Sequence, residues 1–423
     1  MTAPLVGPYA TPRRAQRTAR RRDRRVYLRS HPVLFALLAA TRRRPVVRIG
    51  RTVLVHGTEA YREVLTRVPL DRTAAGTTGG AAARLTDGGL LFDQDGAGHR
   101  AARRALSAEL GSGAVARLRP LWQGVLDERL AVLDQAGPTR DGRPRDGRAT
   151  VGLPTVDPPT VDLVELAREL AGVTTAVLTA CAADPLVLAR AAADAAAATA
   201  RDHLPGPRRP GGAGAAARAA AGLTALLPDS LDAMLAVAAV NTTVAALPRA
   251  AAWCADAGLW AGLTPATAPA LAAELLRLTA PSPVLPRVAA ADATVAGCPV
   301  ARGDRLILVA RHAARAQDDT PADPAAATQA VFGAGPHACP GAGLARAQLA
   351  DLLLALAPYR PVVVRARVDR RSALPGYAEL RVRAGLPAGA GPRSGPARPS
   401  GSGLPSGNGL PSGPARPAGT DAP

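Results

Sequence analysis

The segment from Phe332 to Arg346, FGAGPHACPGAGLAR, constrains the fold of this chain more than any other. Its glycines permit a tight loop with unusual backbone dihedral angles. Cys339 then stands directly before a predicted helix, with Pro340 at the first helical position, which proline favours. A cysteine there lies at the positive end of the helix dipole, which lowers the pKa of the thiol. The segment therefore predicts an activated thiolate on a loop that another group can approach closely.

This segment resembles the heme-binding loop of the cytochrome P450 family, whose pattern is F-G-x-G-x-H-x-C-x-G followed by L-A-R. Every defined position of that pattern matches. By resemblance, Cys339 would be the axial thiolate ligand of the heme iron. Phe332 would pack beside the sulfur, His337 would face a heme propionate, and Gly341 completes the cofactor-binding motif. The alternative is a buried, inert cysteine after a glycine turn, which the further motif matches disfavour.

Two more pairs of residues match motifs of that family in the right order. Glu274 and Arg277 share one helix face and can form an ion pair. The resemblance makes them the E-x-x-R pair that supports the heme-binding loop, a structural role. His99 and Arg103 place two cationic donors on one helix face, and the resemblance assigns them, with Arg287, to the heme propionates. Taken singly, each of these residues is more simply interpreted as solvated surface charge.

A long helix is predicted from Ser230 to Leu247, with Asp229 or Ser230 as its N-cap. Pro248 is expected to kink or end it. The family carries A/G-G-x-D/E-T-T in this helix, where the acid and the first threonine organise proton delivery to bound oxygen. The resemblance therefore implies catalytic roles for Thr242 and Asn241.

Asn241 replaces the acid of that motif, and Ala239 replaces its glycine. An amide holds water but cannot relay a proton through its own titration. The competing interpretation is threonine back-bonding within a buried helix, which is stronger for Thr243 than for Thr242.

The family also usually has an arginine in the irregular segment before the heme-binding loop, bridging to the E-x-x-R pair. No arginine lies between Arg315 and Arg346. We therefore expect the support that Glu274 and Arg277 give to the loop to be incomplete.

The remaining pattern is mainly α with a small β-region, an α+β class, and the resemblance implies the cytochrome P450 fold, a single large helical domain around heme. A β-hairpin is predicted over residues 45–55, and short strands over 286–310. Loops rich in Gly and Pro are predicted at 70–90, 136–160 and 204–213. We expect a disordered Arg-rich arm at 1–28, the heme domain at 29–384, and a disordered Gly/Pro/Ser tail at 385–423.

The net charge of +19 is concentrated near the N-terminus, since residues 1–50 carry thirteen arginines and one acid, Asp23. One interpretation is an arm that binds nucleic acid or an anionic membrane. The favoured interpretation is a solvated Arg-rich leader whose composition reflects a GC-rich genome. No nucleic-acid partner is expected. The run from Pro32 to Ala40 is too short to span a bilayer, so no transmembrane segment is predicted. The chain has no C-x-x-C pair, and four scattered cysteines fit a cytoplasmic protein.

The function implied by the resemblance is a heme-thiolate monooxygenase that contains heme b. It would oxidise a small organic molecule of secondary metabolism with O2 and two externally supplied electrons. No flavin, nicotinamide or iron–sulfur fingerprint is present, so a separate ferredoxin and ferredoxin reductase are expected to serve a monomeric enzyme. The alternatives are a heme-thiolate peroxygenase or oxidative-coupling enzyme with impaired proton delivery, and a non-catalytic heme-binding protein.

Overall fold

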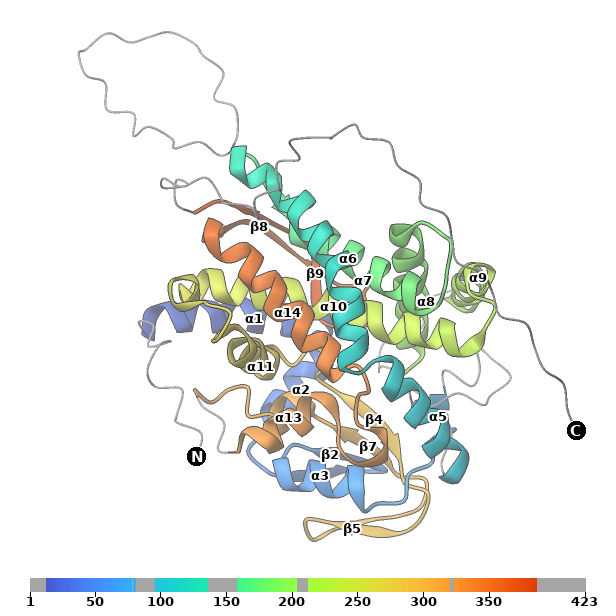
Figure 1. Ribbon diagram of the computed structural model, residues 1–423. Helices are drawn as coiled ribbons and strands as arrows, with labels where there is room; N and C mark the ends of the chain where they lie inside the picture. The colour runs from blue at the N-terminus through green and yellow to red at the C-terminus, as the bar shows by residue number, and fades with distance from the viewer. Residues whose placement is uncertain are drawn as a thin grey trace, which may run out of the picture. The chain divides into compact units, whose positions relative to one another are not determined.

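The computed structural model describes residues 13–77, 79–80, 96–135, 158–203, 212–319 and 323–385. These residues are mostly helical with small sheets, which confirms the predicted fold class (Figure 1). The expectations for residues 1–12 and for the tail beyond Gly385 lie outside the described residues. So do most of the loops predicted at 136–160 and 204–213.

The helices follow the chain in an order set by apolar spacing. Their bounds are α1 (Arg13–Ser30), α2 (Pro32–Thr41), α3 (Thr58–Thr66), α5 (Gly96–Glu109), α6 (Ser112–Leu130), α7 (Leu163–Leu178), α8 (Pro185–His203), α9 (Gly212–Leu226), α10 (Ser230–Ala257), α11 (Ala268–Thr279), α12 (Ala310–Ala313), α13 (Pro324–Phe332) and α14 (Ala342–Leu356).

The largest described sheet has the strand order β1-β2-β7-β4. Its strands are β1 (Val46–Ile49), β2 (Thr52–Val55), β4 (Leu285–Val288) and β7 (Arg305–Leu308). β1 and β2 form the predicted antiparallel hairpin, and Gly50 takes the positive φ of +58° that its turn requires. β7 pairs in parallel with β2 and antiparallel with β4, so the sheet joins residues 46–55 to residues 285–308.

Two smaller sheets complete the described β-structure. One has the order β3-β9-β8, and the other pairs β5 with β6. Their strands are β3 (Val161–Asp162), β5 (Ala293–Val295), β6 (Cys298–Val300), β8 (Val362–Asp369) and β9 (Gly376–Arg383).

Helix α10 packs against α1, α7, α8, α11 and α14 and is the centre of the helical core. The Asp229 carboxylate caps its start, accepting hydrogen bonds from the backbone N–H groups of Leu231 and Asp232. The prediction that the helix stops near Leu247 is wrong, because it passes through Pro248 and ends at Gly258. The residues after the proline are buried in the core, and this packing outweighs the lost backbone hydrogen bond. α10 is also the one described helix long and apolar enough to cross a membrane, and 33% of its apolar window is buried within the protein.

The expected disorder of residues 1–28 is wrong from Arg13 onward, because residues 13–30 form helix α1. This helix buries Ala19, Val26 and Tyr27 against the body of the protein and packs along α10, β8 and β9. The buried Asp23 carboxylate pairs with Arg249 and with Arg311, at 2.6 Å in both cases. The arginine-dominated composition hid this apolar stripe, whose members recur at helical spacing.

Candidate active site

The Cys339 loop joins α13 to α14. Gly333 and Gly335 have positive φ angles of +79° and +69°, which are the unusual dihedral angles that the sequence predicted. The backbone N–H of Cys339 donates to the carbonyl of Phe332 at 2.6 Å and closes the loop. The prediction of Pro340 as the first helical residue is wrong, since Gly341 is the N-cap and α14 begins at Ala342. Cys339 therefore precedes the helix by a short turn.

The Cys339 side chain is accessible to solvent, although protein atoms surround it closely. Burial among these atoms raises the pKa of its thiol, and a hydrogen bond from the Gly341 backbone and the charges of Arg103 and Arg346 oppose that rise. The net direction is upward, which corrects the predicted lowering of this pKa. The physical reason is that desolvation of the sulfur raises this pKa by more than the hydrogen bond and the two arginine charges lower it. A bound metal ion would remove the proton outright.

Helix α5 brings the predicted pair His99 and Arg103 to this loop. His99 is only 2% exposed, and its ring stacks on the ring of His337 with centroids 4.0 Å apart. Arg103 donates a hydrogen bond to the carbonyl of Ala338, next to the cysteine. Two motifs far apart in the sequence therefore meet within one cluster.

Arg287, on β4, is a half-buried residue whose guanidinium Nε atom is fully buried and has little compensation. One of its Nη atoms donates to the carbonyl of Pro286 at 2.8 Å, and its Nε atom has no hydrogen-bond partner among the described residues. Burial, together with the charge of nearby Arg72, lowers the pKa of Arg287 to about 10. A buried guanidinium in this state suits a carboxylate that the protein itself does not provide. The sequence did not single out Arg72, which lies in a Gly/Thr-rich segment without motif spacing.

Phe332 and Arg346 flank the cysteine from the ends of α13 and α14. The Arg346 guanidinium lies over the Phe332 ring, 4.8 Å from its centroid, and its buried Nε also has no partner among the described residues. The pair adds a second incompletely compensated cation beside the sulfur.

Asn241 and Thr242 bond within α10 and to its neighbour. The Asn241 amide donates to the carbonyl of Val237 at 2.7 Å and more weakly to Ala192 of α8 at 3.4 Å. The exposed Thr242 hydroxyl donates back to the carbonyl of Ala238 at 2.8 Å. The back-bonding expected mainly of Thr243 is thus found at Thr242. Among the described residues, neither side chain hydrogen-bonds to the Cys339 loop.

Glu274 and Arg277 form the predicted ion pair, with both carboxylate oxygens accepting at 2.8 and 2.6 Å. The incomplete support of the heme-binding loop stays a prediction, because among the described residues no hydrogen bond joins Glu274 or Arg277 to residues 332–346. The remaining donors of Arg277 reach backbone carbonyls of the segment before the loop, including those of Ala314 and Asp318. The pair therefore holds residues 314–319, a segment that includes Arg315.

A second arginine, on α1, also binds the segment before the loop. Arg20 donates to the carbonyls of Ala316 and Gln317 and to the carboxylate of Asp319, at 3.1, 2.8 and 2.8 Å. No local sequence pattern links Arg20 to these partners, because nearly 300 positions separate them in the chain.

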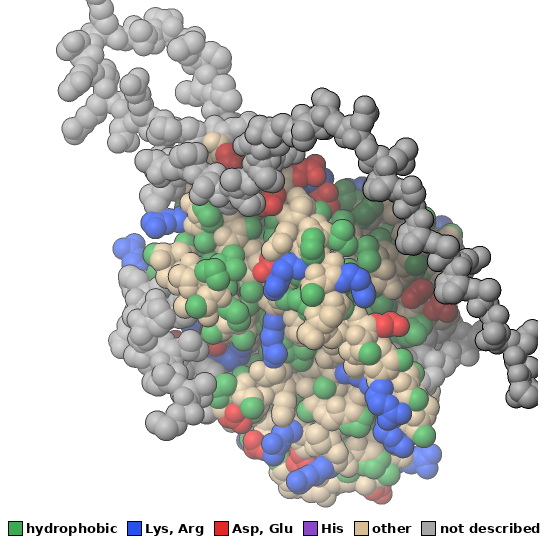
Figure 2. All heavy atoms as spheres, viewed as in Figure 1, with side chains coloured by type: hydrophobic (Ala, Val, Ile, Leu, Met, Phe, Trp, Pro, Cys, Tyr) green, Lys and Arg blue, Asp and Glu red, His purple; other side chains and the backbone are tan. Residues whose placement is uncertain are grey.

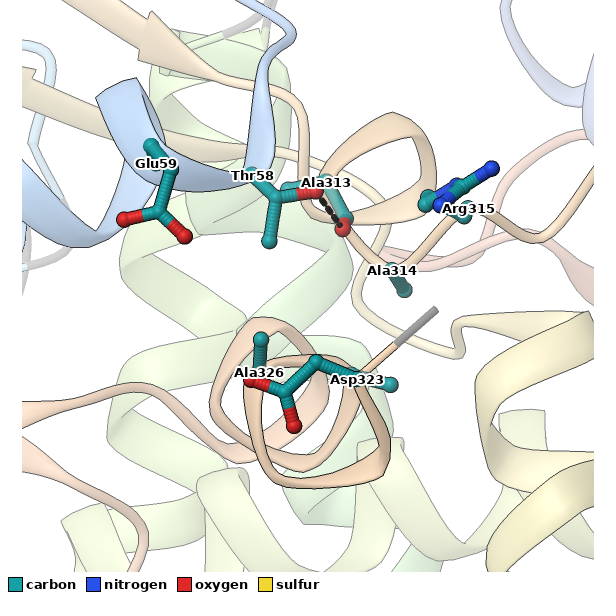
Figure 3. A pocket seen from close by; sticks show the side chains of 8 residues that line it. Thr58, Glu59, Ala313, Ala314, Arg315, Asp323 and Ala326 are labelled. Carbon is teal, nitrogen blue, oxygen red and sulfur yellow. Dashed lines mark hydrogen bonds between the residues drawn. The ribbon is translucent and has the colours of Figure 1, made fainter. Parts of the chain in front are cut away.

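A small hollow of about 210 Å³ lies elsewhere, between α3, α12 and α13 (Figure 3). Thr58 lines the hollow and donates a 2.8 Å hydrogen bond to the carbonyl of Ala313. Other lining residues are Glu59, Arg315 and Asp323. None of the predicted site residues lines this hollow. It is therefore separate from the Cys339 cluster.

No protein-family model matches this sequence, and no curated protein sequence matches it either. Solved structures do. The chain is 17% identical to the P450 heme domain of Tepidiphilus thermophilus, with a TM-score of 0.60, covering 84% of this chain and 94% of that one. It is 21% identical to the open form of cytochrome P450 EryK from S. erythraea, with a TM-score of 0.63 and coverage of 85% and 98%.

A third similar structure is CYP109E1 from Bacillus megaterium in complex with testosterone. It is 17% identical, with a TM-score of 0.62, and the match covers 85% of this chain and all of that one. Similarity of this extent at such low identity shows the fold, as the resemblance of the Cys339 loop implied. The chain therefore has the cytochrome P450 fold.

Proposed function

We propose that this protein is a heme-thiolate monooxygenase that oxidises a small organic molecule with O2 and two electrons from outside. The observation that carries the proposal is the convergence of His99 and Arg103 with His337 around the accessible Cys339, in a chain with the cytochrome P450 fold. We further propose heme b as the cofactor, a separate ferredoxin and ferredoxin reductase as electron donors, a cytoplasmic monomer, and a role in secondary metabolism.

The residues present fit a heme. Cys339 offers one soft sulfur ligand, and Gly341 leaves the space beside it open, since a Cβ there would lie 4.0 Å from the sulfur. Arg287 is a buried cation whose Nε lacks a partner, as a propionate site requires. His99, Arg103 and His337 would complete that side. The described residues hold no cluster of His, Cys, Asp and Glu suited to a different metal site.

A bound heme would supply redox chemistry and dioxygen activation, and the chain would supply orientation, charge and protons. Arg287, with Arg103, would fix the cofactor by its carboxylates. The stacked rings of His99 and His337 would exclude water from that edge. The Thr242 hydroxyl would hold a proton near the reacting oxygen, at the cost of its back-bond to Ala238.

One observation favours the alternative of a peroxygenase or oxidative-coupling enzyme. The Asn241 amide is held by two backbone carbonyls and has no titrating group, so it is a poor proton relay. In the monooxygenase assignment, Asn241→Asp should raise the yield of product per NADPH consumed about tenfold or more. Asn241→Gln is the matched control. An unchanged yield with Asp would remove the argument from proton delivery.

The test of the proposed function is the absorption spectrum of the reduced protein with and without carbon monoxide. A red-shifted Soret band of the thiolate type is expected, and Cys339→Ser should abolish it while Cys298→Ser leaves it in place. A spectrum of the histidine-ligated type would favour the non-catalytic heme protein. Failure to bind any heme would overturn the assignment.

A further inference from the structure

Helix α2 presents an apolar face to solvent. Its inner side packs against the main sheet and the end of α1 through Leu34, Phe35 and Leu38. On the opposite side Val33 is 84% exposed and Leu37 is 42% exposed, one helical turn apart. The smaller exposed residues on this side are Pro32, Ala36 and Ala40. A helix that is apolar all round and yet half exposed has a face without a partner.

Arginines border this apolar face at both ends. Arg29 precedes α2, and the run Arg42–Arg44 follows it. The outer side of α1 adds a stripe of exposed arginines, namely Arg14, Arg17, Arg21, Arg24 and Arg25. None of these nine side chains forms an ion pair with a described residue, and the single acid of α1, Asp23, is buried.

On the face shown in Figure 2, arginine side chains are spread among apolar and uncharged surface. The α1–α2 surface, defined by the exposed residues named above, instead combines concentrated positive charge with a continuous apolar strip.

We propose that the α1–α2 surface docks on an anionic lipid surface. Arginine binds lipid phosphate and the apolar strip enters the headgroup boundary, which is the recognition mode of helices that lie in an interface. Nucleic acid would match the charge but would leave Val33 and Leu37 unused. A second copy would match the strip but would bring two arginine stripes together. Charge and apolar surface together therefore favour lipid.

The geometry favours docking without spanning. α2 has ten residues, about 15 Å of helix, which is half of a hydrocarbon core. The angle between α1 and α2 is held by Tyr27 of α1, which stacks on Phe35 of α2 with ring centroids 3.9 Å apart. The surface is thus preformed, and docking requires little ordering of the chain.

The experiment is sedimentation of the full chain with vesicles of phosphatidylcholine alone and of phosphatidylcholine mixed with phosphatidylglycerol. We expect binding to the anionic vesicles only, weakening as salt is added. The double substitution V33S/L37S should reduce the partition coefficient about tenfold. Replacing Arg42, Arg43 and Arg44 by Ser should reduce it by about fivefold per arginine.

Matched controls are Val187→Ser, an exposed valine on α8, and Arg218→Ser, an exposed arginine on α9, neither of which should change binding. Circular dichroism checks that each variant folds. Three results would overturn the proposal: no binding to anionic vesicles at low salt, binding that V33S/L37S leaves unchanged, or a dimer in light scattering that V33S/L37S dissociates. The last result would assign the strip to a second copy. Vesicle binding does not depend on heme, so its failure is distinguishable from failure of the proposed function.

Discussion

Two regions of this protein hold fully or partly buried arginines and differ in what neutralises these cations. At the junction of α1, α10 and α12, Arg249 and Arg311 share the buried carboxylate of Asp23 and reach backbone carbonyls besides. Around the proposed heme site, Arg287 of β4 and Arg346 of α14 each keep a buried Nε without a hydrogen-bond partner among the described residues. The first region supplies its own counter-charge and is structural. The second leaves positive charge for an anion to complete, and this is how a binding site differs from a core ion pair.

The largest expected effect is at the structural junction. Asp23→Ala leaves Arg249, which is 2% exposed, without its counter-charge, and should lower the free energy of unfolding by about 3–5 kcal/mol. Urea denaturation measures this. The control is Asp319→Ala, which removes an exposed partner of Arg20 and should cost no more than about 1 kcal/mol. Equal losses in the two variants would break the distinction between the regions.

At the proposed heme site, loss of a charged side chain is expected to weaken heme binding without lowering the stability of the heme-free protein. Arg287→Met removes a buried and poorly compensated cation, so the heme-free protein should lose no stability and should gain about 1 kcal/mol. Heme affinity should fall at least about tenfold, because a charged contact to a carboxylate is lost. Heme titration and denaturation of the same sample separate the two effects. As a contrast, Arg277→Met should lower stability, since Arg277 pairs with Glu274. A destabilised heme-free Arg287→Met protein would contradict our assignment.

A third way to bury basic groups is to keep them neutral, as His56 and His312 show. Their Nδ1 atoms are 2.9 Å apart, and His56 also contacts the Thr41 hydroxyl at 3.0 Å. Burial lowers the pKa of His56 to about 4 and that of His312 to about 3, the latter with help from the charges of His56, Arg311 and Arg42.

Because these folded-state pKa values lie below the unfolded value of about 6.5, the unfolded chain takes up protons first as the pH falls. Stability from this pair is therefore complete above pH 6.5 and declines as the pH falls towards 4. We expect a loss of about 1–2 kcal/mol by pH 5, after discounting for solvent that reaches His312. Denaturation of the protein and of the His56→Gln variant, above pH 6.5 and at pH 5, measures this loss of stability. An equally steep decline in the variant would exclude the pair as the cause.

The smallest effect is expected for the hydrogen bonds between Arg20 of α1 and the segment before the loop. Arg20→Met removes hydrogen bonds to Ala316, Gln317 and Asp319 and should cost about 1 kcal/mol. It should also speed heme loss, because the same segment rests on Glu274 and Arg277. Heme transfer to apomyoglobin measures the rate. Arg21→Met, an exposed neighbour without an ion pair among the described residues, should change neither quantity.

Local patterns were sufficient for several features. The glycines and cysteine of the 332–346 segment, the Asp229 cap and the hairpin at Gly50 depend on residues close together in the chain, and each was predictable. The meeting of His99 and Arg103 with that segment was expected only through the resemblance to a known family. Their spacing alone is indistinguishable from that of surface charges.

Contacts between distant residues were decided by the tertiary structure alone. The sequence predicted disorder where α1 folds, because its arginines mask an apolar stripe whose partners lie on α10 and β9. It did not indicate that Arg20 binds residues 316–319, because nearly 300 positions separate these partners in the chain. It also predicted a lowered pKa for Cys339, whereas burial raises it. The physical reason is common to all three: the sequence determines short-range dihedral preferences and helix periodicity, but desolvation and long-range hydrogen bonds exist only once distant segments have packed together.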